Sequence, residues 1–401
     1  MMLSAEFNET VIMFKKLTIF LSLSLMAFPA LRAEARVSVL TCAPGNEAYS
    51  LFGHTGLRYA DDEKGIDIVF NYGYFDFDAP NFIWRFVLGE TDYMVGAVPF
   101  DRFVDEYSER GSAVIEQVLE LSPQQEQALF DALVKNCRPE NRVYRYNYFY
   151  NNCTTKIRDK VAEAAGDIGM PDTVARYVTF RDALNALTAS HPWYSFGINL
   201  LLGSDVDAPA TGYGLQFIPQ NYMLDLERCS VALSGGNVPF VKEQNILVEG
   251  KAPAVVHSNF TPFNASLLLL LATFVVMLCE VRKKKTFWGF DILLMALQGL
   301  AGVLLLFMAL FSQHPAVGNN WLLLLLNPLS LVLMPLLVRS VRKGRAPLVA
   351  WAQVTFASLF FLSAIFSLQV YPVPVYFCAA AILVRSLFLI YKENICELSR
   401  F

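Results

Sequence analysis

The spacing of apolar and polar residues divides the chain into two unlike parts that meet near residue 262. Beyond that point the sequence consists of long apolar runs, each of about 18–23 residues and therefore long enough to cross the hydrocarbon core of a membrane. They cover 263–281, 289–311, 321–338, 348–368 and 374–391. Residues 263–401 are therefore predicted to form an all-α domain of five transmembrane helices.

Residues 36–262 show a different pattern, in which short apolar stretches alternate with helical segments. The expected strands are 37–41, 56–59 and 66–71. Ser122 and Pro123 are typical of an N-cap followed by the first helical residue, so a helix is expected from Pro123 through Val134. Hairpin strands with separate helices, in place of repeated βαβ units, predict an α+β domain.

The first 35 residues have the pattern of a targeting signal. Lys15 and Lys16 precede an apolar segment at 17–28 that is short for a membrane span, and Ala33 and Ala35 form a small-residue cleavage site. Residues 1–35 are therefore predicted to be an N-terminal extension and a secretory signal peptide. An uncleaved anchor helix is the alternative.

Basic residues between the apolar runs predict the orientation of the chain. They follow the first, third and fifth runs, at 282–285, at 339–345 and at Lys392 and Arg400. The loops 312–320 and 369–373 contain no Lys or Arg. By the positive-inside rule, the domain at 36–262 lies outside the cytoplasm, the chain crosses the membrane five times and the C-terminus lies inside.

Composition and charge narrow the function. A hydrophobic content of 55% is too high for one soluble domain, and the excess lies in the predicted spans. Residues 36–262 contain 29 Asp and Glu against 18 Lys and Arg, a net charge of −11. This charge disfavours nucleic acid as a partner. The sequence has no metal-ligand spacing and no phosphate-binding glycine loop, so neither a metal nor a cofactor is expected.

One cysteine has the surroundings of a nucleophile. Cys153 lies in the stretch 146–159, YNYFYNNCTTKIRD, where aromatic residues give way to an amphipathic helix. At a helix N-terminus, exposed backbone N–H groups and the helix dipole favour a thiolate over a thiol. The exported cysteines Cys42, Cys137 and Cys229 can form at most one disulfide, and small buried residues are the favoured reading of all three.

A nucleophilic cysteine requires a base, and His54 is the best candidate. It lies between Gly53 and Gly56 at the start of an expected strand, so no bulky neighbour locks its ring into a core. A hairpin centred near Glu63 would place residues 71–73 opposite His54. The candidates for orienting its ring are Asn71 first, Tyr72 second and Asp76 third, with a plain turn as the alternative reading.

A further set of polar residues is available for contacts with a substrate: Arg58, Arg158, Asn152, His314 and Asn319. Guanidinium groups bind phosphates well, although for Arg158 a structural ion pair with Glu140 or Asp159 is the alternative. The loop 312–320 lies on the outer membrane surface, where its polar residues can shape a headgroup site or remain an ordinary interfacial loop.

The ordered motifs of the chain resemble the Lnb-type family. They are LTCAPG at 40–45, GHTGLR at 53–58, FNYGYFDF at 70–77, PENR at 139–142 and NNCTTKIRD at 151–159. Members of this family have an N-terminal periplasmic domain related to circularly permuted NlpC/P60 papain-like folds, followed by a membrane region. In such permuted folds the histidine precedes the cysteine, as His54 precedes Cys153. The family pattern often has Asp at the position of Asn152.

The resemblance implies a lipoprotein N-acyltransferase. Such an enzyme would transfer an acyl chain from a membrane phospholipid, through a Cys153 thioester, to the α-amine of a diacylated lipoprotein. Two alternatives stay open, namely a membrane-tethered cell-wall cysteine peptidase or amidase, and a non-catalytic membrane scaffold or transporter. Charges within the spans that would suit a transporter are scarce, and Arg385 is expected to be alone there.

Overall fold

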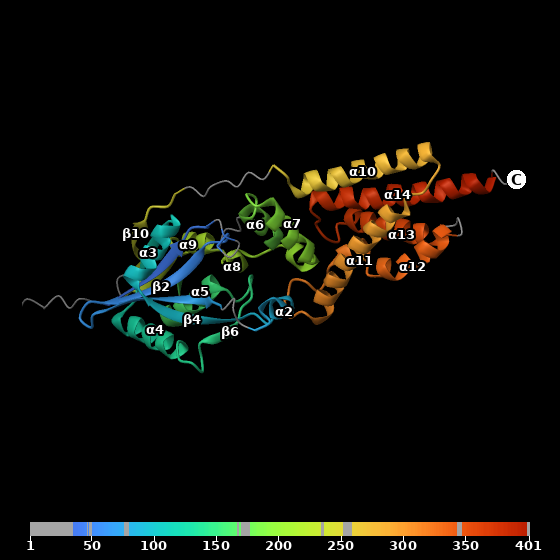
Figure 1. Ribbon diagram of the computed structural model, residues 1–401. Helices are drawn as coiled ribbons and strands as arrows, with labels where there is room; N and C mark the ends of the chain where they lie inside the picture. The colour runs from blue at the N-terminus through green and yellow to red at the C-terminus, as the bar shows by residue number, and fades with distance from the viewer. Residues whose placement is uncertain are drawn as a thin grey trace, which may run out of the picture.

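The computed structural model describes residues 35–45, 47, 50–75, 80–166, 168–169, 177–233, 236–251, 259–342 and 347–398. An α+β domain and a bundle of long helices lie end to end (Figure 1). The predicted signal peptide lies outside the described residues, apart from Ala35. The order of α+β and all-α parts agrees with the sequence prediction.

A seven-stranded sheet, antiparallel at every pairing, forms the frame of the N-terminal domain. Its order is β10 (Val241–Val248), β5 (Val114–Leu119), β1 (Arg36–Cys42), β2 (His54–Asp61), β3 (Ile66–Tyr74), β4 (Asp92–Pro99) and β6 (Val143–Arg145). A small second sheet joins β7 (Ile168–Gly169), β8 (Ser230–Leu233) and β9 (Gly236–Pro239). The strands expected at 37–41, 56–59 and 66–71 are confirmed as parts of β1, β2 and β3.

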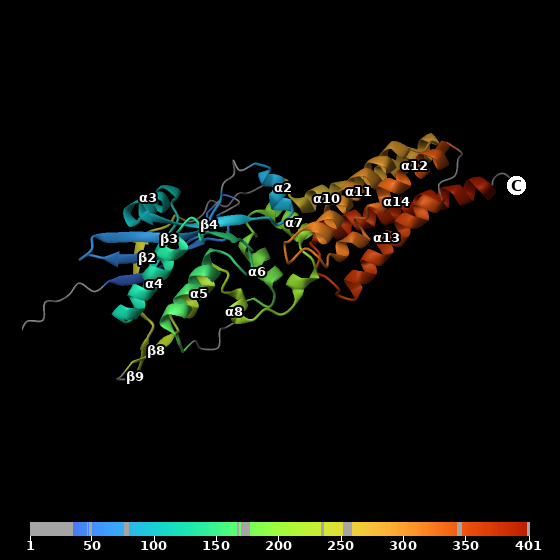
Figure 2. The same cartoon turned by 90° about the horizontal axis from the view of Figure 1, so that it is seen from below.

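Helices cover both faces of the large sheet (Figure 2). On one face α4 (Pro123–Asn136) and α5 (Cys153–Ala165) pack against side chains such as Val39, Leu57 and Tyr59. On the other, α3 (Phe100–Arg110) packs against Leu40 and Val69. Because successive side chains of a strand point to opposite faces, a sheet covered on both faces buries nearly every residue of its central strands, as in β1 and β2. The helix predicted at Pro123 is confirmed, with a capping box at Ser122.

Short helices complete the N-terminal domain. They are α2 (Phe82–Val87), α6 (Phe180–Leu187), α7 (Pro192–Leu201), the 3-10 helix η1 (Ser204–Asp207), α8 (Gly212–Leu215) and α9 (Pro219–Leu226). Of these, α2 and α7 contact the helical domain: the Trp84 ring of α2 lies against Phe307, and Phe196 of α7 packs into the core of the helical domain.

The helical domain contains five candidate membrane spans, as predicted. Its elements are α10 (Pro262–Lys283), α11 (Trp288–Phe311), the 3-10 helix η2 (Trp321–Leu324), α12 (Leu329–Arg342), α13 (Pro347–Ile365) and α14 (Val373–Leu398). The third span is not one α-helix, because η2 is separated from α12 by a break at Asn327 and Pro328.

The expectation that Arg385 is the only charge within the spans is wrong. Its guanidinium forms ion pairs with Asp291 at 2.6 Å and with Glu280 at 2.7 Å, and all three side chains are at most 7% exposed. Lys392 lies 3.3 Å from the second oxygen of Glu280. The cluster joins α10, α11 and α14, and its charges balance, which makes a structural role the simplest account.

Two loops of the helical domain hold the N-terminal domain in place. The backbone of Gly203 and Ser204 donates to the carbonyls of Ala316 and Asn319, both at 2.8 Å. The Gln369 side chain donates to the Leu202 carbonyl at 3.1 Å. A Cβ on Gly203 would come within 2.7 Å of the Asn319 carbonyl oxygen, so only glycine allows this close approach. The two domains are therefore joined by direct backbone contacts.

Candidate functional site

Cys153 is the first residue of α5, as the sequence predicted. The preceding Asn152 caps the helix: its side-chain oxygen accepts from the backbone N–H of Thr155 at 2.9 Å, and the Thr155 hydroxyl accepts from the Asn152 N–H at 2.8 Å. Residues in the first turn of a helix have no intrahelical partner for their N–H groups. The N–H groups of Cys153 and Thr154 therefore remain directed out of the helix start.

His54 is the first residue of β2, in the centre of the large sheet. The chain enters the strand through Gly53, whose φ of +76° is unfavourable for other residues and whose Cβ would lie 2.6 Å from the Cys42 carbonyl oxygen. Strand pairing places His54 opposite Cys42. The His54 ring stacks on the Tyr107 ring of α3, with 6.4 Å between the ring centroids. The ring is thus held from several sides.

The Cys153 thiol and the His54 imidazole lie close enough for a charge interaction and a hydrogen bond between them to shift the pKa of both. Burial would raise the pKa of the Cys153 thiol, but the His54 charge, this hydrogen bond and the Thr55 backbone N–H outweigh burial and lower it below its ordinary value. Burial would likewise lower the pKa of His54, yet the Cys153 charge and the hydrogen bonds to Cys153 and Asn71 raise it. The two shifts favour a thiolate beside an imidazolium, which is the reactive form of a cysteine nucleophile.

Asn71 contacts the imidazole through one ring nitrogen. Its Oδ1 is 3.1 Å from His54 Nε2, so Nδ1 is the ring nitrogen that Asn71 does not contact. The β2–β3 hairpin pairs Gly56 with Asn71, as its expected centre near Glu63 required. Asn71 is buried, and its amide donates to the Tyr74 hydroxyl at 3.2 Å, so the orientation of its side chain is fixed by two contacts.

A hydrogen bond between two threonines, which the sequence did not indicate, links the strand and the helix that carry the site. The Thr55 and Thr154 hydroxyls, which neighbour His54 and Cys153, lie 3.0 Å apart and are fully buried. Because each threonine follows its functional residue in the chain, this bond fixes the strand start against the helix start. Both threonines belong to the motifs quoted above, but only the tertiary fold brings them together.

Three tyrosines on the segment before α5 lie near the thiol. Burial raises the pKa of Tyr144, Tyr146 and Tyr148, and the nearby Cys153 charge raises each of them further. The hydroxyls of Tyr144 and Tyr148 are buried and have no hydrogen-bond partner within the described part of the chain. Tyr144 packs against the core cluster that contains Cys153. An unpaired buried hydroxyl beside a nucleophile is available to a reacting group.

The other candidates for the orienting group are placed differently. Tyr72 lies in the core and donates its hydroxyl to Asn136 at 2.7 Å, away from the imidazole contact made by Asn71. Asp76 lies outside the described residues. Asn71 is therefore the candidate that the structure brings to His54.

The two arginines proposed for a phosphate are already engaged in ion pairs. Arg58 is buried and pairs with Asp67 at 2.7 Å and with Glu116 at 2.9 Å, so its guanidinium joins three strands. Arg158 pairs with Asp159 at 2.8 Å, the alternative considered from the sequence, and its guanidinium stacks on the Tyr213 ring. Both charges are used within the fold, and neither is free for a phosphate.

The remaining candidates have structural contacts as well. The Asn152 amide donates to the Phe217 carbonyl at 2.8 Å, so both ends of its side chain serve the helix start. His314 Nε2 lies 2.8 Å from the Phe86 carbonyl and thereby joins α2 to the helical domain. Asn319 lines a cavity at the same junction. Cys42 and Cys229 are free and buried, as expected, and Cys137 is free and half-buried.

Within the described ranges, no group of three His, Cys, Asp or Glu side chains is arranged to hold a metal ion. The side chains of the site offer a thiolate nucleophile, an imidazole that exchanges one proton, and N–H and O–H donors near the thiol.

Comparison with known protein families gives two matches. Residues 30–186 match the model described as the Lnb N-terminal periplasmic domain. Residues 254–394 match the model described as the Lnb transmembrane domain. The first match covers much of the α+β part, the second covers the five helices, and residues 187–253 lie between the two. No curated protein and no solved structure matches the chain.

Proposed function

The chain belongs to the Lnb family and is a multi-pass membrane protein with a periplasmic N-terminal domain, and we propose that it is a thiol acyltransferase. It would move an acyl chain from a membrane phospholipid to the α-amine of a diacylated lipoprotein in a bacterial inner membrane. The observation that carries this proposal is the Cys153–His54–Asn71 arrangement in a domain fixed by backbone hydrogen bonds to the membrane helices.

The first half-reaction forms a thioester. The Cys153 thiolate attacks the ester carbonyl of the phospholipid, so a sulfur–carbon bond forms and the bond from the carbonyl carbon to the glycerol oxygen breaks. The His54 imidazolium gives its proton to the departing oxygen, which leaves a lysophospholipid. Asn71 accepts from His54 Nε2 and keeps Nδ1 directed at the reacting atoms.

The second half-reaction transfers the acyl group. The lipoprotein amine attacks the thioester carbonyl, a nitrogen–carbon bond forms, and the sulfur–carbon bond breaks. Neutral His54 takes the proton that the amine loses, which restores the thiolate and imidazolium. In both steps the carbonyl oxygen becomes negative, and the N–H groups of Cys153 and Thr154, with the unpaired Tyr144 hydroxyl, are the donors proposed to stabilise it.

A papain-like ancestry remains part of this proposal. Its support is the order of the residues, with histidine before cysteine, together with an imidazole that contacts an asparagine and lies close to a cysteine at a helix start.

Trapping the intermediate tests the proposal. Purified protein in liposomes of phospholipid alone, without an acceptor, should gain the mass of one acyl group on the peptide that contains Cys153, in a form released by hydroxylamine. His54→Ala should abolish the adduct, whereas Cys137→Ala, which alters a half-buried thiol elsewhere in the domain, should leave it intact. An acyl adduct that persists in Cys153→Ala protein would contradict the mechanism.

A further inference from the structure

The outer half of the third span has an unusual backbone. Its α-helix, α12, contains 14 residues and is therefore about 21 Å long, short of the roughly 30 Å of a hydrocarbon core. The remainder is the 3-10 helix η2 and the break at Asn327 and Pro328. Irregular backbone at membrane depth is tolerated only where it is buried in protein or lines a cavity.

The break is held by specific contacts. The Gln298 side chain of α11 donates to the Leu325 carbonyl at 2.7 Å, which satisfies a backbone acceptor that the missing helical turn leaves free. Gly302 of α11 lets the two segments meet, because a Cβ there would lie 2.5 Å from the Leu326 carbonyl oxygen. The short span is thus a stable part of the fold.

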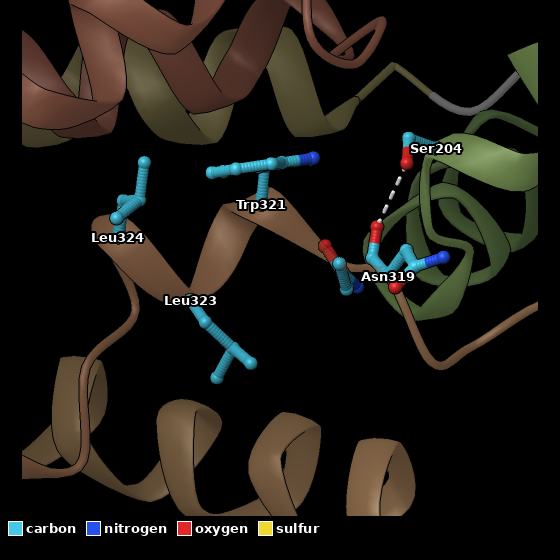
Figure 3. Close-up of a pocket in the computed structure, with 6 residues that line it drawn as sticks. Ser204, Asn319, Trp321, Leu323 and Leu324 are labelled. Atoms are coloured by element: carbon cyan, nitrogen blue, oxygen red, sulfur yellow. Dashed lines mark hydrogen bonds between the residues drawn. The ribbon is translucent and has the colours of Figure 1, made fainter.

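Beside η2 lies a cavity of about 490 Å³, within the range of ligand sites. It is lined by Ser204, Asn319, Asn320, Trp321, Leu323 and Leu324. Ser204 and Asn319 meet at one end of the cavity, where the Ser204 hydroxyl donates to the Asn319 carbonyl at 3.2 Å (Figure 3). The other end is apolar, with Trp321 and Leu324 on one side of the η2 ribbon and Leu323 on the other. The cavity therefore has a polar end and an apolar end.

The surroundings place this cavity at the membrane surface. Trp321 begins the third span and is 41% exposed, and two further exposed tryptophans, Trp84 of α2 and Trp193 of α7, project from the N-terminal domain next to the helices. Tryptophan is enriched where the hydrocarbon meets the headgroups. The polar end of the cavity then lies at headgroup level, and its apolar end lies in the periplasmic leaflet.

The charge at the polar end distinguishes among lipids. None of the lining residues is charged. Two charges beside Ser204 neutralise each other, because Arg181, which donates to the Gly203 carbonyl at 2.7 Å, forms an ion pair with Asp207. Asp205 is an exposed carboxylate that accepts from the Asn319 amide at 2.9 Å and has no cationic partner among the described residues. Its charge also reaches Tyr150, three residues before Cys153 in the chain. This end of the cavity attracts an ammonium group and repels an anionic headgroup.

We propose that this cavity binds a zwitterionic glycerophospholipid of the periplasmic leaflet. One acyl chain lies along Trp321, Leu323 and Leu324, and the ammonium headgroup lies near Asp205. The role of the site, to hold the acyl donor next to the Cys153 segment, rests on the proposed function. The binding itself does not, and it is measurable in protein that cannot react.

Photocross-linking tests the proposal. The full chain carrying Cys153→Ala is placed in nanodiscs that contain phosphatidylethanolamine with a photoreactive acyl chain, and the labelled peptides are identified by mass spectrometry. Labelling should concentrate on residues 321–324, and Leu323→Trp, which fills the cavity, should lower it at least about fivefold. Leu310→Trp, at an exposed position on α11, should leave it unchanged. Uniform labelling around the helices, or no effect of Leu323→Trp, overturns the site.

Two further comparisons test the occupant. A phosphatidylglycerol probe should label residues 321–324 about two- to fivefold less, the effect of one exposed charge. Asp205→Asn, a surface change that keeps the fold, should remove this difference. Equal labelling by both lipids in unaltered protein, or displacement of the phospholipid by a diacylated lipopeptide, overturns the assignment of a zwitterionic phospholipid.

The two proposals fail separately. Absence of lipid at 321–324 together with Cys153-dependent acylation leaves the function standing and removes this site. Lipid at 321–324 together with acylation that survives Cys153→Ala leaves the lipid site standing and removes the proposed function.

Discussion

Asn71→Ala removes the side-chain acceptor that holds the His54 ring. The bond from His54 Nε2 to Asn71 Oδ1 is 3.1 Å long and partly buried, and the imidazole that donates it is charged when Cys153 is a thiolate. A hydrogen bond to a charged group contributes about 1.5–3 kcal/mol. Loss of that contribution in the transition state corresponds to a fall of roughly 10- to 150-fold in the acylation rate.

The pH profile separates this role from a general loss of structure. The bond to Asn71 is one of the contacts that raise the pKa of His54. Without it that pKa falls, so the imidazolium is lost at lower pH and the alkaline limb of the reaction moves to lower pH. Asn71→Asp keeps the acceptor and adds a negative charge, which should restore much of the rate and move the alkaline limb to higher pH.

The assay measures two quantities in the same proteoliposomes. One is the single-turnover rate of acyl transfer to a synthetic diacylated lipopeptide, and the other is the rate of Cys153 alkylation by iodoacetamide from pH 5 to about pH 10, a range that brackets ordinary thiol titration. The matched control is Asn136→Ala, which removes another asparagine side chain, one that accepts from Tyr72. Asn71→Ala protein with a rate within about twofold of the unaltered protein and an unshifted alkylation profile would refute the reasoning.

Three further predictions concern packing and the oxyanion. Gly203→Ala forces a Cβ to within 2.7 Å of a backbone oxygen, so it should loosen the domain junction and increase proteolysis between the domains. Gly197→Ala, which has open space around the new Cβ, should not change the digestion. Equal digestion patterns for the two variants would argue against the junction. Arg385→Met leaves Asp291 buried without its cation and leaves Glu280 with Lys392 alone, so it should cost about 3–5 kcal/mol, seen as a clear fall in Tm in detergent. Arg339→Met, outside the cluster, should change Tm little, and an unchanged Tm for the Arg385 variant would contradict the ion-pair account. Tyr144→Phe removes a buried hydroxyl that has no hydrogen-bond partner among the described residues, so Tm should stay equal or rise. If that hydroxyl stabilises the oxyanion, the acylation rate should fall by about 100-fold. An unchanged rate excludes the hydroxyl as a donor.

Local sequence signals were sufficient for much of the site. The helix start at Cys153 follows from a capping asparagine and the amphipathic residues after it, and the meeting of His54 with Asn71 follows from one short hairpin. Both depend on residues close in the chain, where spacing alone fixes the geometry. The five spans are equally local, because length and apolar content define them.

Other features depend on contacts between distant parts of the chain. Arg58 reaches Glu116 only because β5 pairs with β1, and no local pattern indicates that strand order. The contact of Thr55 with Thr154 and the packing of Tyr144 near the thiol have the same origin. In the membrane, the 3-10 turn at the start of the third span and the break after it became evident only from the structure.

The central claim is that Cys153 carries an acyl group to the amine of a lipoprotein. The most direct test is the mass of the N-terminal lipopeptide of an endogenous lipoprotein, isolated from cells that produce the unaltered protein, Cys153→Ala or His54→Ala. The account predicts a triacylated peptide with the unaltered protein and a diacylated peptide, lighter by one acyl chain, with either variant. The same triacylated mass in all three strains would contradict it, and a change confined to the peptide cross-links of the cell wall would point to a peptidase.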